Sequence, residues 1–121
     1  RRPRTNTPLQ ALALMNDPVY VEAARALAHR VLTHGGPTTR DRVRYAFTLV
    51  LGRRPAPAEV ALLTAAFDRE FSQFAADREA ANRLIHVGAS RPPVDVDIAE
   101  LAAWTIVAST LLNLDEAITR G

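Results

Sequence analysis

A stretch without charged residues, between Leu101 and Leu114, restricts the fold of this chain more than any other feature. Its spacing predicts a helix from Asp97 to Leu114, with apolar residues on nearly every side, and such a helix must be buried on most of its surface. The stretch is shorter than the roughly 20 residues that cross a bilayer. We therefore expect the central helix of a small all-α domain, and no transmembrane segment.

Capping residues and prolines predict the remaining helices. A Ser, Thr or Asp before the first turn and a Pro in its first position are typical helix starts, and Gly is a typical end. No stretch alternates apolar and polar residues over a useful length. We predict a compact orthogonal or irregular bundle of about five to six helices around the central apolar C-terminal helix. The other expected helices cover residues 7–15, 18–34, 39–51, 57–75 and 77–85.

Helical spacing also predicts which faces are buried. For the helix over 18–34 the predicted face is Val19, Ala23, Ala26, Leu27, Arg30 and Val31. For the helix over 39–51 it is Val43, Phe47, Val50 and Leu51, widened by Ala46 and Leu49. For the helix over 57–75 it is Val60, Leu63, Phe67, Phe71 and Phe74.

Length and composition favour one domain over residues 1–121, preceded by an extended basic leader over residues 1–6. The chain does not begin with Met, so we expect it to be a fragment of a longer protein. The absence of Cys excludes disulfides and thiolate metal sites. All 15 basic residues are Arg, and without the three in the leader the net charge is −1. No basic patch large enough to hold nucleic acid follows from this balance.

The residues usual in catalysis or metal binding are poorly placed here. His29 and His34 diverge on a helix, and His86 lies at a helix end, so all three are interpreted as structural. Helix capping explains Asp95, Asp97 and Glu100 better than a calcium site does, with Asp97 as the cap and Glu100 as the reciprocal half of a capping box. No serine has a His or acid at a suggestive spacing. We predict no catalytic residue, no metal site and no cofactor in this fragment.

Three segments carry a resemblance to a known family. They are RRPRTNTPLQALALMNDPVYVEAARALAHR, AFTLVLGRRPAPAE and ELAAWTIVASTLLNLDEAITR. In this order they resemble the planctomycete-type C-terminal domain of unknown function found in large secreted proteins with cytochrome-c-like segments. The resemblance implies a long parent chain, export to the periplasm or the exterior, and accompanying haem-attachment and carbohydrate-binding-like domains. The haem motif C-x-x-C-H is absent here, so any haem would lie elsewhere in the parent chain.

Seven polar residues of the two end motifs form the candidate site. Two interpretations compete: a structural clasp that ties the N-terminal leader to the C-terminal turn through hydrogen bonds and an Arg–carboxylate pair, or a shared functional groove. We favour the clasp. The seven residues are Asn6, Gln10, Asn16, Asn113, Asp115, Glu116 and Arg120.

These observations favour a non-catalytic helical structural or interaction module of an exported multidomain protein. The first alternative is part of a carboxylate-dependent hydrolase acting on polysaccharide, with Asp115 or Glu116 as acid or base. The second is nucleic-acid binding through the Arg-rich leader, which we consider the weaker hypothesis. The expected partners are other domains of the parent chain and a protein or polysaccharide.

Overall fold

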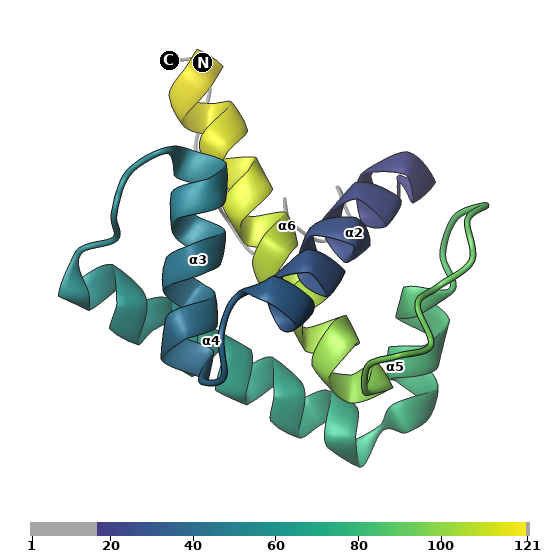
Figure 1. The fold of residues 1–121 in the computed structure, drawn as a ribbon. Coiled ribbons are helices and arrows are strands. Elements are labelled where there is room, and N and C mark those ends of the chain that lie inside the picture. Colours follow the sequence, from purple (N-terminus) through teal and green to yellow (C-terminus); the bar gives the residue numbers. More distant parts are fainter. Residues whose placement is uncertain (1–16, 121) are drawn as a thin grey trace.

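The computed structural model describes residues 17–120, with side chains as far as Asp115, and shows an all-α bundle (Figure 1). The fold class predicted from the sequence is confirmed, since the described residues form five helices and no strand. The helices are α2 (Pro18–His34), α3 (Thr39–Leu51), α4 (Pro57–Ala76), α5 (Arg78–Ile85) and α6 (Ile98–Arg120). The helix expected over residues 7–15 lies outside the described residues.

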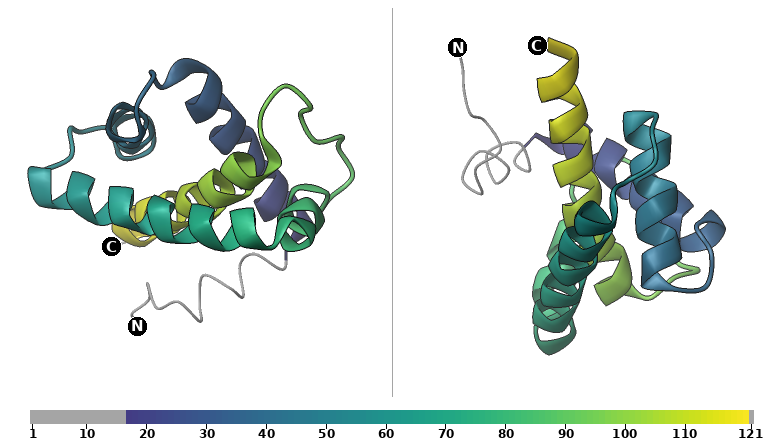
Figure 2. Two further views of the ribbon diagram at one scale, coloured as in Figure 1. Left: turned by 90° about the horizontal axis from the view of Figure 1, so that it is seen from below. Right: turned by 90° about the vertical axis from the view of Figure 1, so that its left-hand side faces the viewer.

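Helix α6 is the centre of the bundle. It packs against the four other described helices, and Figure 2 shows α2 and α3 together on one side of it. No residue from Ile98 to Asp115 is exposed, as the charge-free sequence predicts. The predicted end at Leu114 is wrong, because the helix continues to Arg120. No Gly or Pro stands between these positions, and the polar residues there are compatible with a helix.

The stretch Ile98–Asp115 of α6 is long and apolar enough to cross a membrane, judged by length and composition alone. The bundle buries 61% of it, which is the pattern of a core helix. Its apolar surface is therefore covered mostly by the neighbouring helices of the same chain.

Aromatic packing joins α6 to α4. The Trp104 side chain is fully buried, and its ring centroid lies 5.1 Å from that of Phe67. Phe67 in turn stacks on Phe71, with centroids 5.7 Å apart. Aromatic pairs at such distances add about 0.5–1.5 kcal/mol to the burial of their surface. The predicted face of α4 is thus largely correct, with Val60, Leu63 and Phe67 buried and Phe71 and Phe74 half-buried.

The predicted caps start most of the helices. Asp17 accepts a hydrogen bond from the Val19 amide at 3.0 Å, and Asp77 accepts one from the Ala80 amide at 3.1 Å. These bonds satisfy amides that have no partner within the helix. Helix α3 ends where the sequence predicts, at Leu51, and is followed by Gly52, which has φ 75°.

The capping of α6 departs from prediction in one respect. Asp97 accepts from the Glu100 amide at 3.0 Å, as expected. The Glu100 carboxylate lies 3.6 Å from Arg42 on α3, whereas the sequence predicted a reciprocal bond to the Asp97 amide. This carboxylate therefore links two helices, and the N-terminus of α6 is capped by one side chain.

The predicted buried face of α2 is only partly correct, since Val31 is buried and Leu27 is half-buried. Val19 is 73% exposed, and Ala23, Ala26 and Arg30 are also exposed. The helix is rotated so that its buried residues are Val21, Ala24, Arg25, Ala28 and Val31. Both sets follow helical spacing in an alanine-rich segment, so periodicity did not distinguish them. A smaller error concerns Leu49 on α3, which is 41% exposed.

Candidate functional site

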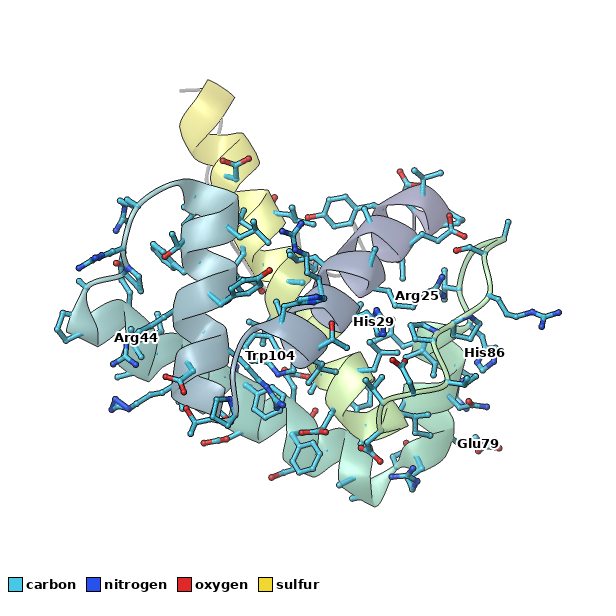
Figure 3. The ribbon with its side chains drawn as sticks, in the orientation of Figure 1. Arg25, His29, Arg44, Glu79, His86 and Trp104 are labelled. Atoms are coloured by element: carbon cyan, nitrogen blue, oxygen red, sulfur yellow. The ribbon has the colours of Figure 1, made fainter. Side chains whose placement is uncertain are left out.

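The densest polar cluster of the described residues lies between α2 and the loop that leads from α5 to α6. Its members come from two regions far apart in the sequence, and Figure 3 shows Arg25 and His29 on α2, on the side of this loop. We call it the loop cluster. It consists of Glu22, Arg25 and His29 on α2 and of Ser90 and Asp95 in the loop.

Arg25 is the buried member of the loop cluster, with only 4% of the residue exposed. Its Nη1 donates to the carbonyl oxygens of Ile85 and Val87, and its Nη2 donates to Ser90 at the carbonyl oxygen (3.3 Å) and at Oγ (2.6 Å). A buried guanidinium needs such partners, because leaving its donors unpaired costs several kcal/mol. The same bonds satisfy carbonyls at the end of α5 that have no partner within that helix.

Glu22 lies one helical turn before Arg25 and holds the same part of the loop. Its Oε2 accepts from the Ser90 amide at 2.6 Å and from Ser90 Oγ at 3.0 Å. These two bonds, with a smaller contribution from the Arg25 charge, lower the pKa of the Glu22 carboxyl below its ordinary value. The carboxylate is therefore kept in its charged form, as an acceptor.

Gly88 allows the loop to approach Glu22 closely. It has φ 100°, and a Cβ atom at this position would lie 2.3 Å from the Cγ of Glu22. The backbone conformation and the lack of space both require glycine here. Helix α5 ends at Ile85, as the sequence predicts, and Gly88 lies in the loop that follows it.

A second bond attaches the loop near its other end. Nε2 of His29 lies 3.0 Å from Oδ1 and 3.2 Å from Oδ2 of Asp95. The two side chains are 34% and 60% exposed, so this pair is weaker than the buried Arg25 bonds. Glu22, Arg25 and His29 follow one another at spacings of three and four, which places them on one face of α2.

The geometry of the loop cluster is suited to holding backbone and poorly suited to catalysis. The Ser90 hydroxyl does lie between a carboxylate and a guanidinium, as in an activated nucleophile. A carboxyl whose pKa is lowered is a weak proton acceptor, however, and Glu22 is already bonded to the Ser90 amide. Within the described part of the chain, no group of three or more His, Cys, Asp or Glu residues could hold a metal ion.

The seven residues predicted as a clasp or groove are only partly covered by the structure. Asn6, Gln10 and Asn16 lie outside the described residues, and so do the side chains of Glu116 and Arg120. Asn113 is buried, with 7% exposed, and Asp115 is half-buried, both near the C-terminal end of α6. The clasp thus stays a prediction.

Sequence reasoning missed the loop cluster. It treated Ser90 as a residue without a nearby acid, and it assigned Arg25 no role. The hydrogen bonds of Glu22 and Arg25 join residues that are 60 to 68 positions apart in the chain, and no local spacing indicates contacts at that range. The three polar residues on one face of α2 were the one available signal. His29 was interpreted as structural, and its contact with Asp95 was not foreseen.

Comparison with known proteins identifies a family but no activity. Residues 1–67 match the family model PSD1, protein of unknown function (DUF1553). The match covers more than half of the chain, which therefore belongs to this family. No curated protein and no solved structure matches the chain.

Proposed function

We propose that the chain is a non-catalytic helical module that packs against, or mediates contacts of, other domains of an exported multidomain protein. The observation that carries this proposal is the use made of the charged groups in the loop cluster. Glu22 and Arg25 direct their polar atoms at backbone and hydroxyl groups of the loop itself. A binding or catalytic site would leave some of these groups free for a ligand.

The surface of the module is suited to contacts with neighbours because its polar loop is held in place. A loop that is already ordered loses little conformational entropy when a partner binds. The proposal includes export, a multidomain parent chain and accompanying cytochrome-c-like segments. These three features come from the family resemblance of the end motifs.

The carboxylate-dependent hydrolase has less support. Such an enzyme needs two acid–base groups a few ångströms apart, or a carboxylate paired with another catalytic group. The side-chain hydrogen bonds of His29, His34 and His86 go to Asp95, Thr33 and the Asn82 carbonyl, and not to Asp115. The leader on which nucleic-acid binding would depend lies outside the described residues.

Hydrogen–deuterium exchange, combined with an activity assay, tests the proposal. The full chain is compared with Glu22→Gln and Asp115→Asn. Glu22→Gln should increase exchange of the amides over residues 86–97, with little change in α4, because the bonds that it weakens hold only the loop. None of the three proteins should release reducing ends from polysaccharides.

Two results would contradict this function. One is polysaccharide turnover by the full chain that Asp115→Asn or Glu22→Gln abolishes, since it would make the altered residue part of a catalytic site. The other is unchanged exchange of the Ser90 amide in Glu22→Gln. In that case the carboxylate would not hold the loop.

A further inference from the structure

Positive and negative charges are concentrated in two different parts of the described chain. Residues 18–56, which form α2, α3 and the following linker, carry seven arginines against Glu22 and Asp41, a net charge of +5. Residues 57–115 carry four arginines against nine carboxylates, a net charge of −5. Helices α2 and α3 lie together on one side of α6 (Figure 2). The near-neutral total therefore conceals a basic part, residues 18–56, and an acidic part, residues 57–115.

In the basic part, exposed arginines lie along one edge of α3. Arg40 and Arg44 are four residues apart, so they lie one turn apart on the same face of the helix. Figure 3 shows Arg44 on the side of α3 that is turned away from α2. We call this surface the α3 basic edge. It consists of Arg40, Arg44, Arg53 and Arg54, all of them exposed.

Arg53 is held at this edge by two contacts. Its Cζ lies 4.8 Å from the centroid of the Phe47 ring, which is three residues after Arg44 on α3. Its two terminal nitrogens donate to the Glu59 carboxylate at 3.0 and 2.9 Å. That bidentate pair, with a bond from the Ala56 amide, lowers the pKa of Glu59 to about 2. Arg53 is therefore a fixed but largely neutralised cation.

The other arginines of the edge keep their charge available. Arg40 and Arg54 have no ion-pair partner in the part of the chain that the structure describes. Arg44 lies 3.6 Å from Asp41, and both side chains are about half exposed, at 53% and 45%. An exposed pair of this kind contributes only about 0–1 kcal/mol, so a ligand can replace it at little cost.

We propose that the α3 basic edge binds a linear polysaccharide that carries sulfate or carboxylate groups. Guanidinium groups bind such oxyanions with two parallel hydrogen bonds, which ammonium groups cannot do. Positions four apart on a helix are about 6 Å apart along its axis, comparable to the length of one sugar unit. The proposal rests on the proposed function as a contact module and names one class of partner.

The same surface is less suited to nucleic acid. Single strands are held by bases stacked on aromatic side chains, but Phe47 is 2% exposed and the Tyr45 hydroxyl accepts a hydrogen bond from Arg30 Nε at 2.8 Å. Duplex binding usually involves about 6–10 phosphate contacts, more than the cations that this edge offers. The remaining alternative ligand for the α3 basic edge is the acidic part of a second copy of the chain.

A matched pair of double variants tests the proposal. Arg40→Gln/Arg44→Gln removes two positive charges from the edge. Arg69→Gln/Arg83→Gln removes the same charge from the acidic part, where the two side chains are 63% and 67% exposed. Binding of labelled dextran sulfate and polygalacturonate to the full chain is measured by fluorescence anisotropy over a salt series. Neutral dextran and a 20-base-pair DNA duplex are measured in parallel.

At low salt we expect the full chain and the Arg69/Arg83 control to bind one or both anionic polysaccharides, and not neutral dextran. Arg40→Gln/Arg44→Gln should weaken this binding by about tenfold or more and reduce the slope of log K against log salt by about 2, one for each cation lost. Binding to dextran sulfate alone, or to polygalacturonate alone, identifies sulfate or carboxylate as the recognised group.

Four outcomes overturn the proposal. They are an equal loss in both double variants, tighter binding to DNA than to either polysaccharide, no binding at low salt, and self-association of the full chain that Arg40→Gln/Arg44→Gln abolishes while neither polysaccharide binds. The length of each polymer after incubation separates this test from the proposed function. Shortened polymer would contradict a non-catalytic module and leave the binding surface intact, whereas absent binding would leave the module intact.

Discussion

Helix α6 and the loop cluster stabilise the chain in different ways. Helix α6 contacts the four other described helices through apolar residues spread from Ile98 to Leu111. The loop cluster holds one segment through a few hydrogen bonds from Glu22, Arg25 and His29. Apolar burial is shared among many neighbours, while hydrogen bonds from a single side chain are lost together. Damage to α6 should therefore affect the whole fold, and damage to the cluster should affect the loop first.

The largest effect is expected for Trp104→Ala. Removing a fully buried indole loses its transfer free energy and leaves a cavity, which costs about 3–5 kcal/mol of the free energy of unfolding. Urea denaturation followed by circular dichroism measures this loss. Leu62→Ala on α4 is the control, because Leu62 is 72% exposed and its truncation should cost less than about 0.5 kcal/mol. Equal losses in the two variants would mean that Trp104 is not part of the core.

A smaller and local effect is expected for Arg25→Met. Methionine keeps an apolar side chain of similar length but leaves the carbonyl oxygens of Ile85 and Ser90 without their donors, at a cost of about 2–3 kcal/mol. Exchange of amides should rise over residues 86–97 before it rises in α6. Arg40→Met on α3 serves as the control, because Arg40 is exposed and has no ion pair in the described part of the chain, and it should stay within about 0.5 kcal/mol of the unaltered chain. Uniform exchange throughout the chain would remove the distinction between the two regions.

The smallest effect concerns pH and the Glu22 carboxyl. Its pKa is lower in the folded chain than in the unfolded chain, so its contribution to stability is present above the ordinary value of 4.5 and is lost as pH falls through the folded value. The difference in Tm between the unaltered chain and Glu22→Gln should therefore shrink as pH falls below 4.5. Thermal unfolding between pH 7 and pH 3 measures it. A constant difference over this range would show that Glu22 is not held by the loop.

Several features of the fold were predictable because they depend on short stretches of chain. Asp17, Asp77 and Asp97 cap helices through amides two or three residues away, and Gly52 ends α3 through its own backbone conformation. Such contacts are visible in the order of residues. The polar candidates near the two ends of the chain were also chosen from sequence, but the structure describes too few of their side chains to test the clasp.

The burial of α6 was determined by the sequence, because a helix with no charge between Leu101 and Leu114 has no face suited to water. The rotation of α2 and the partners of Arg25 were determined by tertiary packing. Apolar residues lie on both sides of α2, so Val19 and Val21 were equally plausible core residues until the neighbouring helices were in place. The hydrogen bonds that Ser90 donates to Glu22 and accepts from Arg25 join positions 68 and 65 residues apart, and such contacts depend on how whole helices meet.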